Sequence, residues 1–386
     1  MMRNPFVKLS IEKMVQGGVG FSRLPDGRVC FVPQALAGEE VEVAISKESK
    51  DYVEARVMQV IKPSPIRIQP KCPLYEKCGG CSLQHVSLES QVLIMKDIVK
   101  ETFLRIGKTA LPDDFPIFST EPWHYRHRAR VVKDRGTKQF GFREEQSHRI
   151  ISFEECPVLT KSLNSFLHLE STQKIPTQEL HCFDNGSGRV SYFYKGMKEA
   201  DQRLLSDNQV LIGDRNISMD ASVFFQSNLS LLSTLVDRVR VHAEKGDWLI
   251  DLFSGVGFFA SLLEDRFSRI TTVEREPGCL RHAKKNLKKA AEQVTANAES
   301  WLLENTKSSP AVLIVDPPRT GLPPEALKVI AEGKIKKMIY VSCNPVTLAR
   351  DLFQLKNSGF EVKAVEGFAF YPHTPHLEML LVLDRG

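Results

Sequence analysis

The C-terminal part of the sequence constrains the fold most, because short apolar runs alternate there with helical segments. From about residue 227 these runs are WLIDLF, ITTVE, AVLIVD and KMIYVS, and each ends near a polar residue or a glycine. Apolar runs of this length, separated by helices, are typical of strands that are buried on both faces of a parallel sheet. The sequence therefore predicts a doubly wound α/β domain over residues 227–386.

The N-terminal part predicts a different unit, which is built of short strands. Between residues 15 and 45 the chain alternates β-rich runs with Gly and Asp-Gly turns, and YVEARVMQVI supplies a further strand. Five or so short strands in about sixty residues suit a small OB-like barrel. An accessory module without a binding role is the alternative. The sequence KPSP at residues 62–65 resembles a linker, so we assign residues 1–62 to this barrel.

A central β-rich domain is expected over residues 63–226, where strand-like runs are mixed with loops. A helix is predicted inside it over residues 90–107, because apolar residues recur there at helical spacing, and it is expected to pack on the C-terminal domain. The segment HYRHRARVVKDRG carries basic residues at a spacing near two. This spacing indicates either a strand face that contacts phosphate or an ordinary solvated strand. The residues concerned are Arg126, Arg128, Arg130 and Lys133.

Composition narrows the class of protein. The net charge of +5 is compatible with RNA binding, but many enzymes carry a similar charge. The N-terminus lacks the apolar run of a signal peptide, and no run of eighteen or more apolar residues is present, so we expect a cytoplasmic protein without a membrane partner. Disulfides are disfavoured in that compartment. Metal binding, catalysis or burial therefore remain as the roles of the eight cysteines.

Three cysteines stand close together in CPLYEKCGGC, at positions 72, 78 and 81. A structural zinc ion or an iron–sulfur cluster usually takes four protein ligands, so the spacing predicts one further ligand from elsewhere in the chain. Spacing alone leaves zinc and an iron–sulfur cluster as alternatives.

A nucleotide site is indicated by WLIDLFSGVGFFASLL, which predicts a strand, a glycine turn and a helix. Gly255 and Gly257 would let the backbone approach a ligand at the carboxyl end of the strand. The next strand ends in Glu274, which can accept hydrogen bonds from ribose hydroxyls. With Asp251 before the turn, this arrangement favours S-adenosylmethionine over a dinucleotide.

Two further strand ends carry reactive groups. AVLIVDPPRTGL places the Asp316 carboxylate at the end of a strand, before a stiff turn, and a plain turn is the alternative. KMIYVSCNPV places Cys343 at the end of the next strand, directly before a helix. We expect this cysteine to face the ligand crevice as a thiolate favoured by the helix N-terminus, although burial is the commoner fate of a lone cysteine.

Taken together, four blocks resemble the RNA uracil-5-methyltransferase family: FFQSN, DLFSGVGFF, VDPPRTGL with VSCNPVTLARDL, and FYPHTPHLEMLLVL. The resemblance covers almost the whole chain. The N-terminal strands are similar to a TRAM domain, an RNA-binding OB-like unit, and C-x5-C-G-G-C is similar to the iron–sulfur motif of the 23S ribosomal RNA branch. The resemblance implies a Rossmann-like class I methyltransferase domain at the C-terminus.

The resemblance also implies a role for individual residues. Cys343 is the expected nucleophile and Glu378 the expected base. The residues expected to bind S-adenosylmethionine are Gln226, Phe253, Gly255, Glu274, Asn297 and Asp316. A 4Fe-4S cluster is expected on Cys72, Cys78, Cys81 and Cys156, with zinc as the alternative, whereas Cys30, Cys182 and Cys279 are expected to be packing residues. A monomeric enzyme acting on 23S ribosomal RNA is expected, with the target uridine turned out of its stack.

Two departures from the family pattern and three other functions stay open. Phe258 stands where relatives often have asparagine, and Ala369 where they often have aspartate. The alternatives are the same chemistry on transfer RNA or on two ribosomal sites, a non-catalytic RNA-binding protein, and a redox enzyme that uses the cluster.

Overall fold

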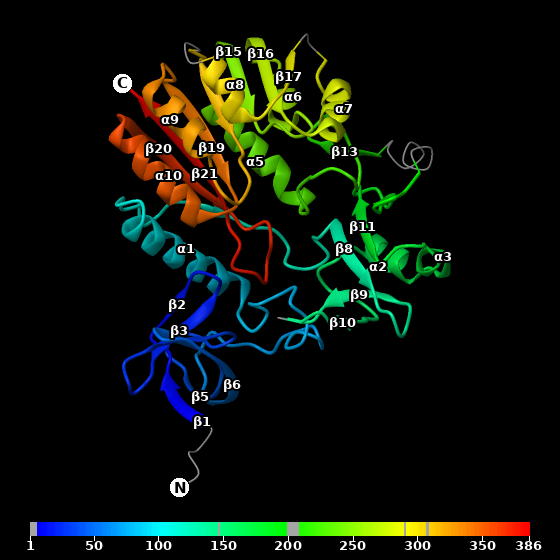
Figure 1. Ribbon diagram of the computed structural model, residues 1–386, viewed down its shortest axis with the longest axis vertical. Coiled ribbons are helices and arrows are strands. Elements are labelled where there is room, and N and C mark those ends of the chain that lie inside the picture. The colour runs from blue at the N-terminus through cyan, green and yellow to red at the C-terminus, as the bar shows by residue number, and fades with distance from the viewer. Residues whose placement is uncertain (1–5, 146, 199–207, 289–290, 306–308) are drawn as a thin grey trace.

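The computed structural model describes residues 6–145, 147–198, 208–288, 291–305 and 309–386. Figure 1 shows three regions: the N-terminal strands at one end, the large C-terminal α/β unit at the other, and a smaller β-rich region beside them. The helix α1 (Leu88–Arg105) lies between the N-terminal strands and the C-terminal unit. None of the helices in the described ranges is both long and apolar enough to cross a membrane.

The N-terminal strands form one curled sheet of order β1-β5-β6-β4-β3-β2. They are β1 (Phe6–Ser10), β2 (Lys13–Val15), β3 (Val19–Arg23), β4 (Val29–Val32), β5 (Glu40–Glu48) and β6 (Tyr52–Lys62). The edge strand β1 also contacts β3, so the sheet bends toward closure, as expected for a barrel. Alternate residues such as Val41 and Val43 are fully buried inside the bend, because successive side chains of a strand point to opposite faces.

The central region contains a five-stranded antiparallel sheet of order β10-β9-β8-β11-β12, and a two-stranded pair that follows it in the chain packs on the core of the C-terminal unit. The sheet strands are β8 (Arg128–Lys133), β9 (Phe140–Arg143), β10 (Ile150–Ile151), β11 (Glu179–Asp184) and β12 (Val190–Phe193), and the pair is β13 (Asn208–Ile212) and β14 (Arg215–Met219). Two short helices, α2 (Lys161–His168) and α3 (Glu170–Gln173), cover the sheet. The β-rich prediction for this region agrees with these strands.

The C-terminal unit is an eight-stranded sheet of order β17-β16-β15-β18-β19-β21-β20-β7. Its strands are β7 (Ile117–Phe118), β15 (Gly246–Leu252), β16 (Phe267–Glu274), β17 (Glu292–Thr295), β18 (Val312–Val315), β19 (Lys337–Ser342), β20 (Phe360–Phe368) and β21 (Glu378–Arg385). The first five in the order are parallel, and β21 is antiparallel to β19. All four apolar runs of the sequence form strands of this sheet.

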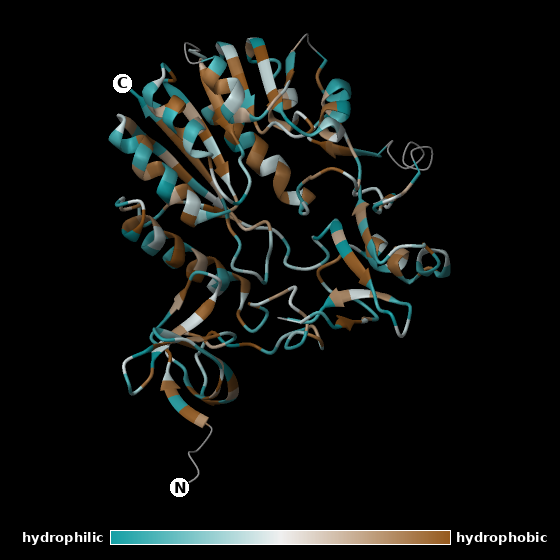
Figure 2. Cartoon of the chain, viewed as in Figure 1, coloured by the Kyte–Doolittle hydropathy of each residue, from teal (hydrophilic) through white to brown (hydrophobic). Residues whose placement is uncertain are grey.

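Helices cover both faces of this sheet, as the alternating pattern predicts. They are α5 (Leu229–His242), α6 (Phe258–Leu262), α7 (Pro277–Asn286), α8 (Ala298–Glu304), α9 (Pro324–Glu332) and α10 (Pro345–Asn357). Two separate hydrophobic cores lie on the two sides of the strands. Figure 2 shows the strands as hydrophobic and the outer faces of the helices as mixed, which is the distribution that a sheet buried on both faces requires.

The helix α1 belongs structurally to the C-terminal unit, although it precedes that unit by more than a hundred residues. Ser87 caps it by accepting a hydrogen bond from the Ser90 N–H. Its buried face, which includes Met95, Val99 and Phe103, joins the core beneath α9 and α10. The strand β7 likewise extends the sheet by pairing with β20. The C-terminal unit therefore includes segments that lie before residue 227.

Replacing Phe103 with alanine tests this packing. Phe103 is fully buried, whereas its neighbour Leu104 is 58% exposed. We expect Phe103→Ala to lower the free energy of unfolding by about 3–5 kcal/mol, because it leaves a cavity, and Leu104→Ala to change it by less than about 0.5 kcal/mol. Denaturant unfolding followed through the transition of the C-terminal unit measures both. Equal losses in the two variants would contradict the packing of α1 on this core.

Candidate active site

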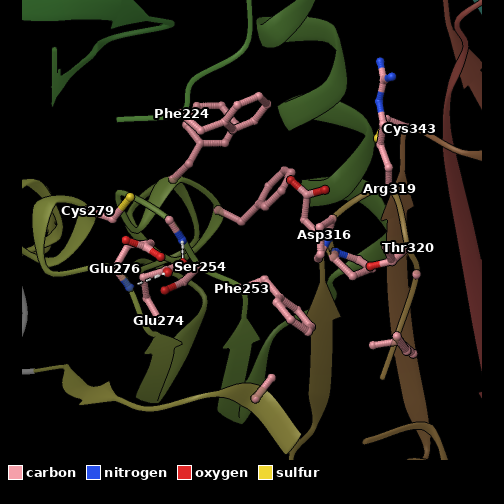
Figure 3. Close-up of a pocket in the computed structure, with 18 of the residues that line it drawn as sticks. Phe224, Phe253, Ser254, Glu274, Glu276, Cys279, Asp316, Arg319, Thr320 and Cys343 are labelled. Atoms are coloured by element: carbon pink, nitrogen blue, oxygen red, sulfur yellow. Dashed lines mark hydrogen bonds between the residues drawn. The ribbon is translucent and has the colours of Figure 1, made fainter. Parts of the chain in front are cut away.

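A cleft of about 840 Å³ opens at the carboxyl ends of the parallel strands. This is the edge at which open α/β sheets bind ligands. Every residue that the sequence predicted for catalysis or cofactor binding lines it: Gln226, Phe253, Gly255, Glu274, Asn297, Asp316, Cys343 and Glu378. Figure 3 shows Phe253, Glu274 and Asp316, which follow or end three different strands, around one space.

The turn after β15 forms one end of the cleft. Phe253, Gly255 and Gly257 all have positive φ, at 61°, 54° and 72°. A Cβ added at Gly255 would meet no atom within 4 Å, so the turn leaves open space above its backbone. One added at Gly257 would lie 3.3 Å from Ala283, because the helices α6 and α7 pack closely there. The turn thus combines room for a ligand with a fixed backbone.

Two carboxyl groups flank this turn. The Glu274 carboxylate accepts hydrogen bonds from the backbone N–H groups of Gly255, Arg275 and Glu276 at 2.8–2.9 Å. Asp251 is fully buried and accepts one from the Ala260 N–H at 3.1 Å, and burial raises its pKa to about 8. Glu274 is therefore held rigidly at the end of β16, in the position from which an acidic side chain reaches a ribose.

Strand register brings the predicted nucleophile and base together at the other end of the cleft. Ser342, the last residue of β19, pairs with Met379 of the antiparallel strand β21. The residues that come next on the two strands, Cys343 and Glu378, are consequently neighbours. Asp316 directly follows β18, and β18 pairs with β19 on the side opposite β21. Three reactive groups far apart in the sequence thus meet at one sheet edge.

Arg319 is a site residue that the sequence analysis missed. Its backbone carbonyl accepts hydrogen bonds from Asn344 Nδ2 at 2.8 Å and from Thr347 Oγ1 at 3.2 Å, so α10 holds the loop after Asp316. Its guanidinium lies against Cys343, where its charge and hydrogen bond lower the pKa of the thiol (Figure 3). The sequence does contain a signal for this role, because Arg319 is a cation only three residues after Asp316 at the strand end.

The predicted thiolate at Cys343 is wrong for the site without substrate. Burial, and then the charges of Glu378 and Asp316, raise the pKa of the Cys343 thiol to about 11, and Arg319 offsets only part of this. At the start of α10 the Asn344 side chain accepts the Val346 N–H. Burial also raises the pKa of Asp316 to about 7 and that of Glu378 well above its usual value.

The structure also gives the surroundings of two further expected cofactor residues and of the two departures from the family pattern. Gln226 accepts a hydrogen bond from the Tyr371 hydroxyl at 3.4 Å, and Asn297 is the N-cap residue of α8. Phe258 packs edge-on against Phe225 at 5.5 Å between ring centroids, so an aromatic contact stands where the family pattern suggested a polar one. Ala369 is fully buried, and its N–H donates to the Phe118 carbonyl, so a core contact replaces the polar support expected there.

The basic segment before and within β8 mostly serves the fold. The Arg128 guanidinium is half-buried and donates to the carbonyls of Ala221 and Val223. Lys133 donates to the carbonyls of Gln173 and Ile175. Each of these two side chains therefore uses two of its donors on backbone carbonyls, which favours a structural role, and the phosphate-contact interpretation stays a prediction.

The cysteines separate into two groups. Cys30 and Cys182 are fully buried, as expected of packing residues, whereas Cys279 is buried but also lines the cleft. The four cysteines of the expected cluster are half-buried and lie near one another. Burial is the main cause that raises the pKa of Cys78 and of Cys81, and the nearby charges of Cys72 and Cys156, respectively, add to it. In the described part of the chain, no group of three or more His, Cys, Asp or Glu side chains is arranged to hold a single metal ion.

Comparison with known proteins gives two domain matches. Residues 303–386 match the family model described as tRNA (Uracil-5-)-methyltransferase, and residues 7–58 match the TRAM domain. A solved structure of Pyrococcus abyssi tRNA (uracil-54, C5)-methyltransferase with S-adenosyl-L-homocysteine has a TM-score of 0.72 and 22% identity, over 97% of this chain and 100% of that chain. This likeness establishes the fold of the whole chain.

Full-length relatives establish the family. An RNA methyltransferase of Aquifex aeolicus is 30% identical over 99% of both chains. Two proteins named 23S rRNA (uracil(1939)-C(5))-methyltransferase RlmD are similar as well. The one from Chromohalobacter salexigens is 31% identical and the one from Halomonas elongata 30%, each over 98% of this chain and 89% of the relative. This chain therefore belongs to the RNA uracil-5-methyltransferase family and is an enzyme that transfers methyl groups from S-adenosylmethionine to RNA.

Proposed function

We propose that this enzyme methylates carbon 5 of one uridine in 23S ribosomal RNA through a covalent bond between Cys343 and the uracil. The observation that carries this proposal is the placement of Cys343 beside Glu378, in the same cleft as the glycine turn and Glu274. The names of the full-length relatives support the ribosomal substrate. The same chemistry on transfer RNA is the second candidate, and the P. abyssi enzyme of the same fold favours it.

Carbon 5 of uracil is too weak a nucleophile to attack a sulfonium methyl group directly. The Cys343 sulfur adds to carbon 6, and the electrons of the C5–C6 double bond move into an enolate. Carbon 5 then takes the methyl group from S-adenosylmethionine, which leaves as S-adenosylhomocysteine. Glu378 removes the remaining proton from carbon 5, the C5–C6 double bond forms again, and the C6–S bond breaks. The thiolate is then ready for another turnover.

Arg319 is the residue placed to make this thiolate available. With a pKa near 11, only about one Cys343 thiol in ten thousand is ionised at pH 7. The guanidinium opposes the effect of burial and of the two carboxyl groups. A positive charge fixed beside the sulfur stabilises the Cys343 thiolate when the uracil enters the cleft and displaces water.

The cofactor residues fit the opposite end of the cleft. Glu274 is suited to the ribose hydroxyls, and Phe253 and Gly255 to the open face of the turn. Asn297 is suited to the adenine, while Gln226 and Asp316 stand toward the methyl group and the uracil. This order would place the sulfonium between the glycine turn and Cys343, so the target uracil enters from the RNA side as a flipped base.

We further propose a 4Fe-4S cluster on Cys72, Cys78, Cys81 and Cys156. Each thiolate of a four-iron cluster binds a different iron, and the four half-buried cysteines lie near one another. A single zinc ion on the same four cysteines is the alternative. Methyl transfer needs no electron, so the cluster would act on structure or on RNA placement.

Methyl transfer from labelled S-adenosylmethionine to unmodified 23S and transfer RNA tests the main proposal. The wild-type enzyme should form 5-methyluridine at one 23S position. Cys343→Ala should lose the activity by at least about 10³-fold and form no covalent complex. Glu378→Gln should accumulate a covalent RNA–protein adduct that survives denaturation, because the last step is blocked. Methylation of transfer RNA alone would favour the second candidate, and an active Cys343→Ala variant would contradict both.

The pH dependence of Cys343 alkylation by iodoacetamide tests the role of Arg319. Only the thiolate reacts, so with a raised pKa the rate should increase about tenfold per pH unit from pH 7 to pH 10. Arg319→Gln should slow the reaction further and Arg319→Lys should restore most of it. Mass spectrometry of the Cys343 peptide gives the rate. A plateau below pH 9 would mean that the thiol is already ionised in the folded protein.

Anaerobic reconstitution with iron and sulfide tests the cluster. We expect about four iron atoms per chain and broad visible absorption. Cys156→Ser should lower both, whereas Cys30→Ala, in the core of the N-terminal sheet, should leave both unchanged. Stoichiometric zinc without visible absorption in protein purified without air would overturn the cluster in favour of the zinc alternative.

A further inference from the structure

The loop between β20 and β21, residues 369–377, carries part of the active site. Tyr371 and His376 line the cleft, and the loop leads directly into Glu378. Figure 1 shows this loop in red, extending from the sheet toward α1 and the central region. Its middle residue, His373, is 4% exposed and has a φ of 66°, a conformation that non-glycine residues rarely adopt. Such a conformation persists only where the surroundings hold it.

Gln91 of α1 supplies much of that hold, and its side chain is fully buried. Its Oε1 accepts a hydrogen bond from the His373 N–H at 2.8 Å. Its Nε2 faces three acceptors: the His373 ring Nδ1 at 3.2 Å, and the carbonyls of Leu83 at 3.1 Å and Val86 at 2.8 Å. One amide therefore joins the active-site loop, the segment after Cys81 and the start of α1.

The Oε1 acceptor and the Nε2 donor of the Gln91 amide each have partners, and these partners fix the orientation of the amide. The His373 N–H needs an acceptor, while the two backbone carbonyls need a donor. Burial lowers the pKa of His373 to about 4, so the ring is neutral at pH 7 and its Nδ1 can accept as well. A carboxylate of the same size would take the side-chain donor away from the carbonyls of Leu83 and Val86, of which Leu83 also accepts the Val86 N–H at 3.1 Å, and would place negative charge against both.

Further contacts to His373 and its neighbour Pro372 also come from segments that precede the C-terminal unit in the sequence. The His373 carbonyl accepts hydrogen bonds from the N–H groups of Ser82 and Leu83, both at 2.9 Å. The His373 ring lies 4.2 Å from the Trp123 ring, and the Tyr125 hydroxyl donates to the Pro372 carbonyl at 3.0 Å. The position of the loop is thus set by segments outside the Rossmann-like sheet.

We propose that Gln91 is a positioning residue of the enzyme, which holds His373 and thereby places Glu378 against carbon 5 of the methylated uracil. This inference rests on the proposed function, because it assigns Gln91 to the proton-removal step of that mechanism. Gln91 touches neither cofactor nor substrate. It acts through the loop, in which Thr374 Oγ1 in turn accepts a hydrogen bond from the His376 N–H at 3.3 Å.

The proposal predicts which step slows when Gln91 is lost. Nucleophilic attack uses Cys343 and Arg319, which α10 holds in place, and cofactor binding uses the turn after β15. Both groups lie outside the 369–377 loop, and Gln226 is the cofactor residue that contacts it, through the Tyr371 hydroxyl at 3.4 Å. Removal of the carbon 5 proton by Glu378 depends on this loop, and a base displaced by about 1 Å can lose about 10²-fold in rate. The covalent adduct that precedes this step should then accumulate.

The experiment compares Gln91→Met with wild type and with Glu378→Gln. Methionine keeps the volume of the side chain and removes all of its hydrogen bonds. We expect kcat to fall by about 10–100-fold, the KM for S-adenosylmethionine to stay within about twofold, and a denaturation-stable adduct with methylated RNA to appear during turnover. Thr102→Val is the matched control: it removes a buried hydroxyl from the same helix, where its bond goes only to the Ile98 carbonyl. It should leave kcat and adduct level unchanged.

The outcomes separate the two proposals. If Glu378→Gln forms no adduct, the proposed mechanism fails, and Gln91 cannot position a base for its last step. If Glu378→Gln forms the adduct but Gln91→Met is slow without one, or as fast as wild type, the positioning role is overturned. Should Gln91→Met fold poorly, Gln91→Asn keeps an uncharged amide but is too short to span the same contacts, and it is tested in its place. Hydrogen exchange of the 369–377 peptide should be faster in either variant than in Thr102→Val.

Discussion

The antiparallel pairing of β21 with β19 is the constraint on which the candidate site depends. Because Ser342 pairs with Met379, the residues beyond them, Cys343 and Glu378, must meet at the sheet edge. A shift of one residue would turn every side chain of β21 to the opposite face of the sheet. The fully buried alternation of Leu380, Leu381 and Leu383 between two hydrophobic cores makes such a shift costly, so core packing fixes the catalytic geometry.

Burial at that edge has a chemical consequence. The same low-dielectric environment that fixes Cys343, Asp316 and Glu378 raises the pKa of all three. The site without RNA therefore holds a neutral thiol, and Arg319 is the neighbouring charge that opposes this effect. The raised pKa makes the Cys343 thiol less reactive toward oxidants and alkylating agents than an ionised cysteine.

The active site also depends on parts of the chain that lie outside the α/β unit. The helix α1 joins the core beneath α10 through Phe103, and the segment after Cys81 holds the 369–377 loop through His373. The cysteine segment, α1 and the loop that leads into Glu378 contact one another. Folding of the cysteine segment is therefore coupled to the position of that loop. This gives a physical reason for a cysteine motif in an enzyme whose reaction needs no electron.

The sequence by itself determined the alternation of strands and helices, the glycine turn and the identity of the reactive groups, because these depend on local patterns: four apolar runs became β15, β16, β18 and β19. The tertiary structure alone decided that Arg319 opposes the burial of Cys343, that Arg128 serves the fold, and that Gln91 reaches His373 across 282 positions. No local period encodes such contacts, since the charge around a thiol and the partner of a buried amide depend on which distant segments pack against them.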